Sequence, residues 1–154
     1  MKPRVAFPPH RVHLLPAGAV AAGALDDGRI VRMRFEGSLV FANVAFFEEQ
    51  LQKMLASTPQ LKVLIIDAVS INEVDASGDQ MLREYYKRLT ESGICVLFTR
   101  VRKPILEIFE RSHMHDDIGK ENFYRYPAGA FYYAWDLIVA DKNLSPKDTP
   151  LKRV

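Results

Sequence analysis

Residues 63–98 read VLIIDAVSINEVDASGDQMLREYYKRLTESGICVLF, and this stretch decides the fold. It begins with VLIID and ends with ICVLF, two short, β-branched apolar runs that are typical of strands buried on both faces. Between the runs, Leu82, Tyr85 and Leu89 recur at helical spacing, and Gly93 follows as a helix-terminating residue. The order strand, helix, strand predicts a βαβ unit with parallel strands and a right-handed crossover.

The residues before this unit indicate two further strands and a helix. Residues 30–35 alternate apolar side chains with arginine, which is the pattern of a half-exposed strand. Gly37 offers a turn, so residues 38–41 are predicted to pair back on that strand as a second, short strand. Asn43 is then predicted to cap a helix that ends at Thr58, before a proline.

The residues after the unit indicate two more helices. Pro104 suits the first turn of one helix, and Pro127 opens the last one. The segment 116–126 is predicted to be a loop with one short strand at Phe123-Tyr124. The buried side of the last helix is predicted from Phe131, Trp135 and Ile138.

The whole chain of 154 residues is predicted to be one α/β domain with irregular ends. We expect a mixed β-sheet of about four to five strands around the parallel βαβ core, packed by about four to five helices. Residues 1–27 contain prolines and small residues and are predicted to be a flexible linker or leader. Residues 141–154 are polar and are predicted to be a frayed tail.

The composition excludes several classes of protein. Lysine and arginine number 21 against 19 acidic residues, so we expect no nucleic-acid partner. No run approaches the roughly 18 apolar residues needed to span a bilayer. Cys95 is the single cysteine, which excludes an internal disulfide. Because it lies within an apolar run, we expect a buried, small hydrophobic side chain there.

Residues suited to catalysis or metal binding do not combine into a recognised pattern. Ser77 has no histidine near it in sequence and no nucleophile-elbow motif around it, so no catalytic residue is predicted. His113 and His115 precede two aspartates, but their spacing matches no zinc site, and we interpret them as a solvated helix end. No glycine-rich phosphate loop occurs. We therefore expect no enzymatic activity, no metal and no cofactor.

The loop after the first strand of the βαβ unit carries Asp-Ala-Ser-Gly at 75–78, and it resembles the signature of the STAS family. Sulfate-permease-type (SulP) transporters and bacterial anti-sigma factor antagonists share this family, whose signature is Asp-x-Ser/Thr-Gly after a buried strand. Two further stretches, GSLVFAN at 37–43 and FERS at 109–112, are similar to segments of the transporter branch. Asp79 follows the signature glycine where antagonists often have an aliphatic residue, which also favours the transporter branch. His113 and its neighbours depart from a glycine that the family often has there.

The resemblance implies a STAS domain over residues 28–140, acting as the non-catalytic, cytoplasmic regulatory and protein-interaction domain of a SulP-type sulfate or anion transporter. Its place would be the cytoplasmic face of the inner or plasma membrane. Its partners would be the transmembrane part of the transporter and a cytosolic protein. Contact is predicted through five residues of the loop and the start of the following helix: Asp75, Ala76, Ser77, Gly78 and Asp79.

Two other functions remain open at this stage. One is a free-standing anti-sigma factor antagonist that is switched by phosphorylation at Ser77. A helix N-terminus would favour the added phosphate, whereas Asp75 and Asp79 would repel it. The other is a weak nucleotide-binding module that holds a phosphate at the same helix N-terminus. A purely structural interpretation makes Ser77 a helix N-cap, completed by Gln80 as a capping box, worth about 1 kcal/mol.

Aromatic residues near the end of the folded part form a second candidate contact surface. Most of them are predicted to pack in the core. Helical spacing places Tyr132 and Trp135 on one side and Tyr133 on another, so some aromatic area is predicted to stay exposed. The group comprises Phe123, Tyr124, Tyr126, Phe131, Tyr132, Tyr133 and Trp135.

Overall fold

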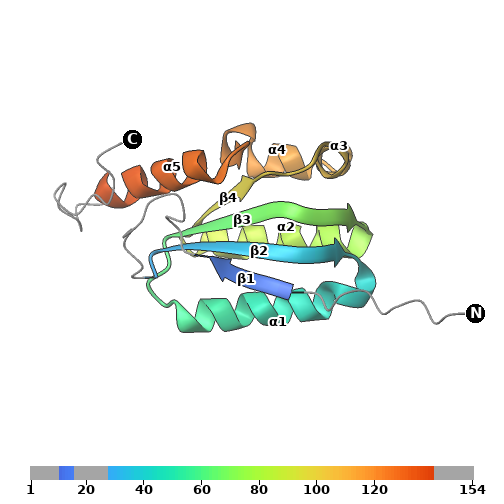
Figure 1. Cartoon of the computed structure of the whole chain (residues 1–154), viewed down its shortest axis with the longest axis horizontal. Helices are drawn as coiled ribbons and strands as arrows, with labels where there is room; N and C mark the ends of the chain where they lie inside the picture. Colours follow the sequence, from blue (N-terminus) through green and yellow to red (C-terminus); the bar gives the residue numbers. More distant parts are fainter. Residues whose placement is uncertain (1–10, 16–27, 141–154) are drawn as a thin grey trace, which may run out of the picture.

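A computed structural model of the chain describes residues 11–15 and 28–140, and Figure 1 shows a twisted sheet with helices on both faces. The sheet has five strands in the order β1-β2-β3-β4-β5. The strands are β1 (Arg11–Leu15), β2 (Ile30–Leu39), β3 (Val63–Val74), β4 (Cys95–Thr99) and β5 (Phe123–Tyr124). The helices are α1 (Phe41–Ser57), α2 (Ala76–Glu91), α3 (Lys103–Arg111), α4 (Met114–Ile118) and α5 (Pro127–Ala140), with a short 3-10 turn η1 (Lys120–Asn122) before β5. The predicted α/β class is confirmed.

The predicted βαβ unit is present as β3, α2 and β4. These two strands pair in parallel, with Val63 opposite Cys95 and Asp67 opposite Thr99. β2 and β5 are also parallel to their neighbours, and β1 is antiparallel to β2. The carboxyl ends of β2, β3, β4 and β5 therefore share one edge of the sheet, where α1, α2, α3 and α5 begin.

The sheet separates two apolar clusters, which explains why its central strands are continuous apolar runs. Leu64 and Ile66 face the larger cluster, formed with α1, α2, α3 and α4. Val63 and Ile65 face the smaller cluster, formed with α5. The buried residues of α5 include Phe131, Trp135 and Ile138, as the helical spacing predicted. Burial on both faces of β3 thus confirms the interpretation of the VLIID run.

The hairpin predicted at the start of the domain is wrong. β2 is one continuous strand from Ile30 to Leu39 and pairs in parallel with β3. The pairing register shifts near Gly37, whose φ is 122°, so this glycine accommodates an irregularity in the strand. The physical reason is that β3 extends to Val74 and offers β2 a longer partner than a hairpin would.

Two further segments differ from expectation. Residues 116–126 were predicted as loop, yet α4 and η1 form here before the expected strand at Phe123. Arg11–Leu15 were placed in a flexible linker, yet they form β1, and their alternation of polar and apolar residues suits an edge strand. The rest of the predicted linker, 1–10 and 16–27, and the predicted tail, 141–154, lie outside the described residues.

Candidate functional site

Asp75 ends the loop between β3 and α2 and is the N-cap of α2. Its backbone is extended, with φ −97° and ψ −176°, and its carboxylate Oδ1 accepts a hydrogen bond from the Gly78 amide at 2.9 Å. The prediction that Ser77 caps this helix is therefore wrong by two residues. The predicted capping box is also absent, because the Gln80 side chain donates to Glu84 instead.

The same carboxylate also holds the start of α1. Asp75 Oδ2 accepts a hydrogen bond from the Phe41 amide at 2.9 Å, so one side chain serves the first turns of two helices. Hydrogen bonds from the Phe41 amide and the Gly78 amide keep the pKa of Asp75 below its ordinary value. The aspartate of the signature is thus a structural link between α1 and α2.

Gly78 is the point of closest approach between α2 and β2. A Cβ atom at this position would lie 1.9 Å from the carbonyl oxygen of Leu39 and 2.9 Å from its Cβ. Only glycine allows the first turn of α2 to pack this tightly on the end of a strand. The aspartate and the glycine of the signature therefore both have structural roles.

Ala76 and Ser77 are the first two residues of α2 and form the accessible part of the signature. Ala76 is exposed and Ser77 is half-buried. Among the described residues, no hydrogen bond of the Ser77 hydroxyl is found, because Asp75 takes the capping role that was predicted for it.

Phe41 is a site residue that the sequence analysis missed. It is the first residue of α1, lies beside the loop through its bond to Asp75, and is 79% exposed. Asn43, predicted as the N-cap of this helix, is instead buried inside its first turn and donates to the Ser38 carbonyl at 2.8 Å. The sequence analysis placed Phe41 at the end of a strand because it started the helix at Asn43. A helix that starts two residues earlier has Phe41 as its first residue.

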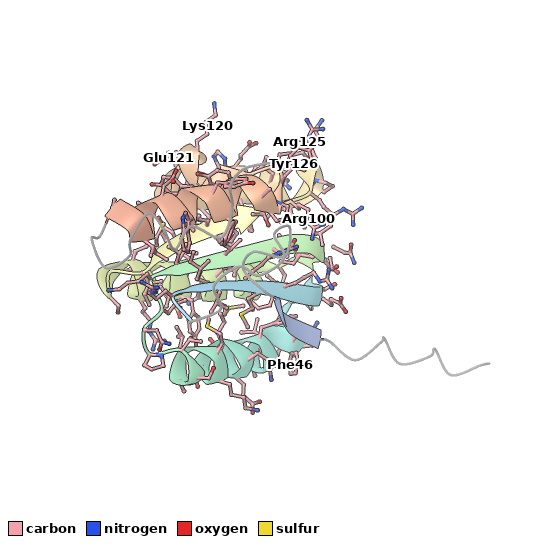
Figure 2. The ribbon with its side chains drawn as sticks, turned by 60° about the vertical axis from the view of Figure 1, so that its left-hand side comes forward. Phe46, Arg100, Lys120, Glu121, Arg125 and Tyr126 are labelled. Atoms are coloured by element: carbon pink, nitrogen blue, oxygen red, sulfur yellow. The ribbon has the colours of Figure 1, made fainter. Side chains whose placement is uncertain are left out.

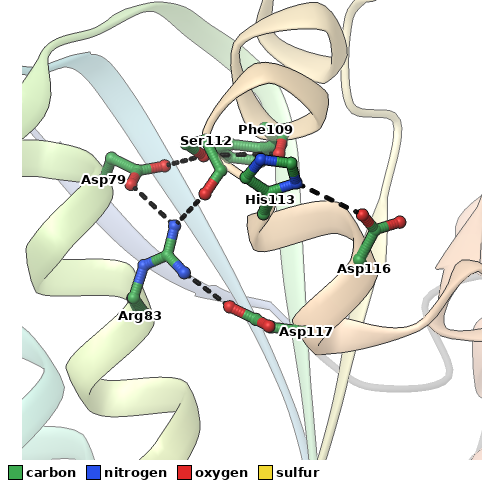
Figure 3. A network of polar contacts seen from close by, with 7 residues as sticks. All are labelled: Asp79, Arg83, Phe109, Ser112, His113, Asp116 and Asp117. Atoms are coloured by element: carbon green, nitrogen blue, oxygen red, sulfur yellow. Dashed lines mark hydrogen bonds and ion pairs between the residues drawn. The ribbon is translucent and has the colours of Figure 1, made fainter.

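Asp79 joins the signature loop to the FERS stretch. The Ser112 hydroxyl donates to Asp79 at 2.8 Å, and Arg83 donates to the other Asp79 oxygen at 3.2 Å and to the Ser112 carbonyl at 2.6 Å. Arg83 also pairs with Asp117 on α4 (Figure 3). Two stretches that the sequence analysis identified separately are therefore bonded to each other, and the start of α2 is fixed to the turn between α3 and α4.

A second polar group lies on the other face of the sheet. Asp67 is fully buried and accepts hydrogen bonds from Arg32 at 2.7 Å and from Arg100. Burial alone would raise the pKa of Asp67, but the bonds from Arg100 and Arg32 outweigh it, and the pKa lies below its ordinary value. One buried carboxylate thus ties β2, β3 and the end of β4 together.

The remaining candidate residues lie away from the loop. His113 is exposed and contacts Asp116 at 3.6 Å, and residues 11–15 and 28–140 hold no group of three or more potential metal ligands. Cys95 is half-buried rather than buried, and burial raises the pKa of its thiol, which makes it a weak nucleophile. Tyr126, Tyr132 and Tyr133 are exposed, whereas Trp135, predicted to share a side with Tyr132, is buried with Phe131.

No described helix has the length and apolar character that a membrane span requires. The open, mostly parallel sheet and the Asp75-linked helix starts define a small α/β domain. The sequence profile of the STAS domain family matches residues 24–129. The chain therefore belongs to the STAS domain family.

Relatives and solved structures place the chain more closely. It is 26% identical over 104 residues to sulfate transporter 1.2 of Arabidopsis thaliana, and the match covers 62% of this chain but 16% of that protein. The SulP transporter STAS domain from Vibrio cholerae superposes with a TM-score of 0.61 at 23% identity, covering 76% of this chain and 88% of that one. A putative anti-sigma factor antagonist from Thermotoga maritima has the same fold, with a TM-score of 0.61 at 13% identity, covering 73% and 91%.

Proposed function

We propose that this chain is a non-catalytic regulatory and protein-interaction domain of a SulP-type anion transporter, located at the cytoplasmic face of the membrane. The support is the similarity to sulfate transporters over 104 residues. The matched region is a small fraction of that relative, so a role beside a separate transmembrane part follows naturally. Transport itself would belong to that other part.

The contact surface we propose consists of Phe41, Ala76 and Ser77, and we name it the loop surface. The observation that carries this proposal is the Asp75 carboxylate, which fixes the starts of α1 and α2 to each other. A surface held by backbone hydrogen bonds loses little conformational entropy when a partner binds. The exposed Phe41 ring supplies apolar area to such a contact.

Mutation of Ser77 to Glu tests the loop surface. The chain is titrated onto the detergent-solubilised transmembrane part of a SulP-type transporter from the same organism, and the affinity is compared with that of wild type. Ser92→Glu places the same charge at the far end of α2 and serves as the control. Loss of binding for Ser77→Glu alone supports the proposal, and equal affinity of both variants with wild type contradicts it.

The alternative is an anti-sigma factor antagonist that a kinase switches at Ser77. The observation that favours it is the Ser77 hydroxyl, which has no hydrogen-bond partner within the described ranges 11–15 and 28–140, together with the fold shared with the Thermotoga maritima protein. Incubation with ATP and the cognate kinase would add the mass of one phosphate. The gene upstream of the Met1 codon separates the two functions, because about ten or more encoded apolar spans indicate a transporter, whereas an upstream stop codon indicates the antagonist.

Weak nucleotide binding at the start of α2 is the third proposal from the sequence. The Gly78 amide of this helix start already donates to Asp75, which leaves fewer donors for a phosphate. A titration with guanine and adenine nucleotides at millimolar concentration tests this, and the absence of heat would reject it.

A further inference from the structure

 

A small cavity opens at the carboxyl ends of β4 and β5, and none of its lining residues belongs to the loop surface. The volume of the cavity is about 230 Å³. Its lining residues are Arg100, Val101, Leu106, Phe123, Tyr124 and Arg125.

The cavity combines cationic and apolar walls. Arg100 and Arg125 contribute guanidinium groups, and Figure 2 shows them with Tyr126 on the same side of the molecule. Val101, Leu106 and Phe123 contribute half-buried apolar surface. A pocket with convergent charged groups beside apolar walls suits a ligand that carries both features.

Positive charge exceeds negative charge around this cavity. Arg100 shares the single carboxylate of Asp67 with Arg32, so two guanidinium groups face one acid. Arg125 lies over the ring of Tyr126 at 5.5 Å, and within the described part of the chain no carboxylate pairs with it. An anion near Arg100 and Arg125 would balance this excess.

The residue that precedes Arg100 of the cavity lining carries a buried donor. Thr99 is fully buried and lies opposite Tyr124 in the sheet register, and within residues 11–15 and 28–140 its hydroxyl has no hydrogen-bond partner. Buried donors that lack an acceptor are uncommon in folded proteins and call for an explanation.

We propose that this cavity binds a small organic anion, with an oxyanion head at Arg100 and Arg125 and a short apolar body against Val101, Leu106 and Phe123. The volume lies below the roughly 300–1,000 Å³ typical of pockets for drug-sized ligands, which favours a ligand smaller than a nucleotide. This site is separate from the loop surface and does not depend on the proposed function.

Titrations of the isotope-labelled chain, followed by NMR at constant ionic strength, test this site with three probes. Benzoate carries both the oxyanion head and the apolar body. Benzyl alcohol has the apolar body without the negative charge, and sulfate has the negative charge without the apolar body. We expect benzoate to shift the guanidinium signals of Arg100 and Arg125 saturably, and to bind about tenfold more tightly than either other probe. Equal binding of benzoate and benzyl alcohol, or of benzoate and sulfate, would overturn the proposal.

Mutation of Arg125 to Gln provides the second test. We expect about tenfold weaker benzoate binding, because one charge-assisted hydrogen bond is lost. Arg111→Gln removes an exposed arginine of α3 outside the cavity and is the control, for which no change is expected. Equal benzoate affinities of the two variants would overturn the proposal. If Arg125→Gln does not fold, the comparison of the three probes on the wild-type chain tests the proposal instead.

Discussion

Mutation of Gly78 to Ala tests how tightly the signature loop packs on the sheet. The added Cβ would lie 1.9 Å from the Leu39 carbonyl oxygen, whereas real Cβ atoms essentially never approach closer than 3.0 Å. The contacting atom belongs to backbone, so β2 or α2 must move by more than 1 Å. Overpacking of this kind costs about 1–3 kcal/mol, and the required backbone movement places the expected loss near 3 kcal/mol.

Gly129→Ala is a matched control, because Gly129 is the third residue of α5 as Gly78 is the third residue of α2. Its added Cβ would lie 3.1 Å from a ring carbon of Tyr124, a side chain that can adjust. We expect a change within about 1 kcal/mol, because the better helix propensity of alanine offsets the contact.

Urea unfolding followed by circular dichroism measures both variants. The midpoint should fall clearly for Gly78→Ala and stay near that of wild type for Gly129→Ala, with unchanged slopes. If Gly78→Ala unfolds at the wild-type midpoint, α2 does not approach Leu39 as closely as described, and the structural role assigned to this glycine is wrong.

Two further substitutions test the polar contacts. Asp67→Asn should lower the free energy of unfolding at pH 7 by about 3 kcal/mol, because Arg32 stays buried without its counter-charge. The lowered pKa of Asp67 means that its contribution is present above the unfolded-state pKa of about 3.9 and is lost as the pH falls through the folded-state pKa. Ser112→Ala should cost about 1 kcal/mol, because Asp79 loses one hydrogen bond. Urea unfolding measures both variants, at several pH values for Asp67→Asn.

Each of these substitutions has a control on the same chain. Asp136→Asn removes an exposed carboxylate of α5 and should leave stability within about 0.5 kcal/mol of wild type. Ser92→Ala removes a local hydroxyl contact at the end of α2 and is compared with Ser112→Ala. Wild-type stability of Asp67→Asn at pH 7 would refute the role of the buried carboxylate, and equal costs for the two serine variants would refute the link through Asp79.

The central strands were predictable because both of their faces are covered. Burial on both sides leaves a continuous apolar run, and the run before Asp67 shows this directly. Gly37 was misinterpreted because glycine suits both a turn and an irregular strand, and the choice depends on pairing with β3. The sequence around Gly37 does not show how long the partner strand β3 is, so it could not decide between a turn and a continued strand.

The candidate site was predictable as a segment but not in its details. Asp75 and Ser77 are both good N-caps two residues apart, and the choice depends on which backbone is extended. The bond from Phe41 to Asp75 spans 34 residues, and that from Ser112 to Asp79 spans 33. Contacts of this range arise from tertiary packing, which periodicity and local motifs do not encode.

The most direct test of the central claim is the affinity of Phe41→Ala for the transmembrane part of a SulP-type transporter. Tyr126→Ala removes another exposed aromatic side chain, 62% exposed against 79% for Phe41, and is the matched control. If the loop surface is the contact, Phe41→Ala binds clearly more weakly than wild type, and Tyr126→Ala binds as wild type does. If only Tyr126→Ala weakens binding, or neither variant does, the loop surface is not the contact.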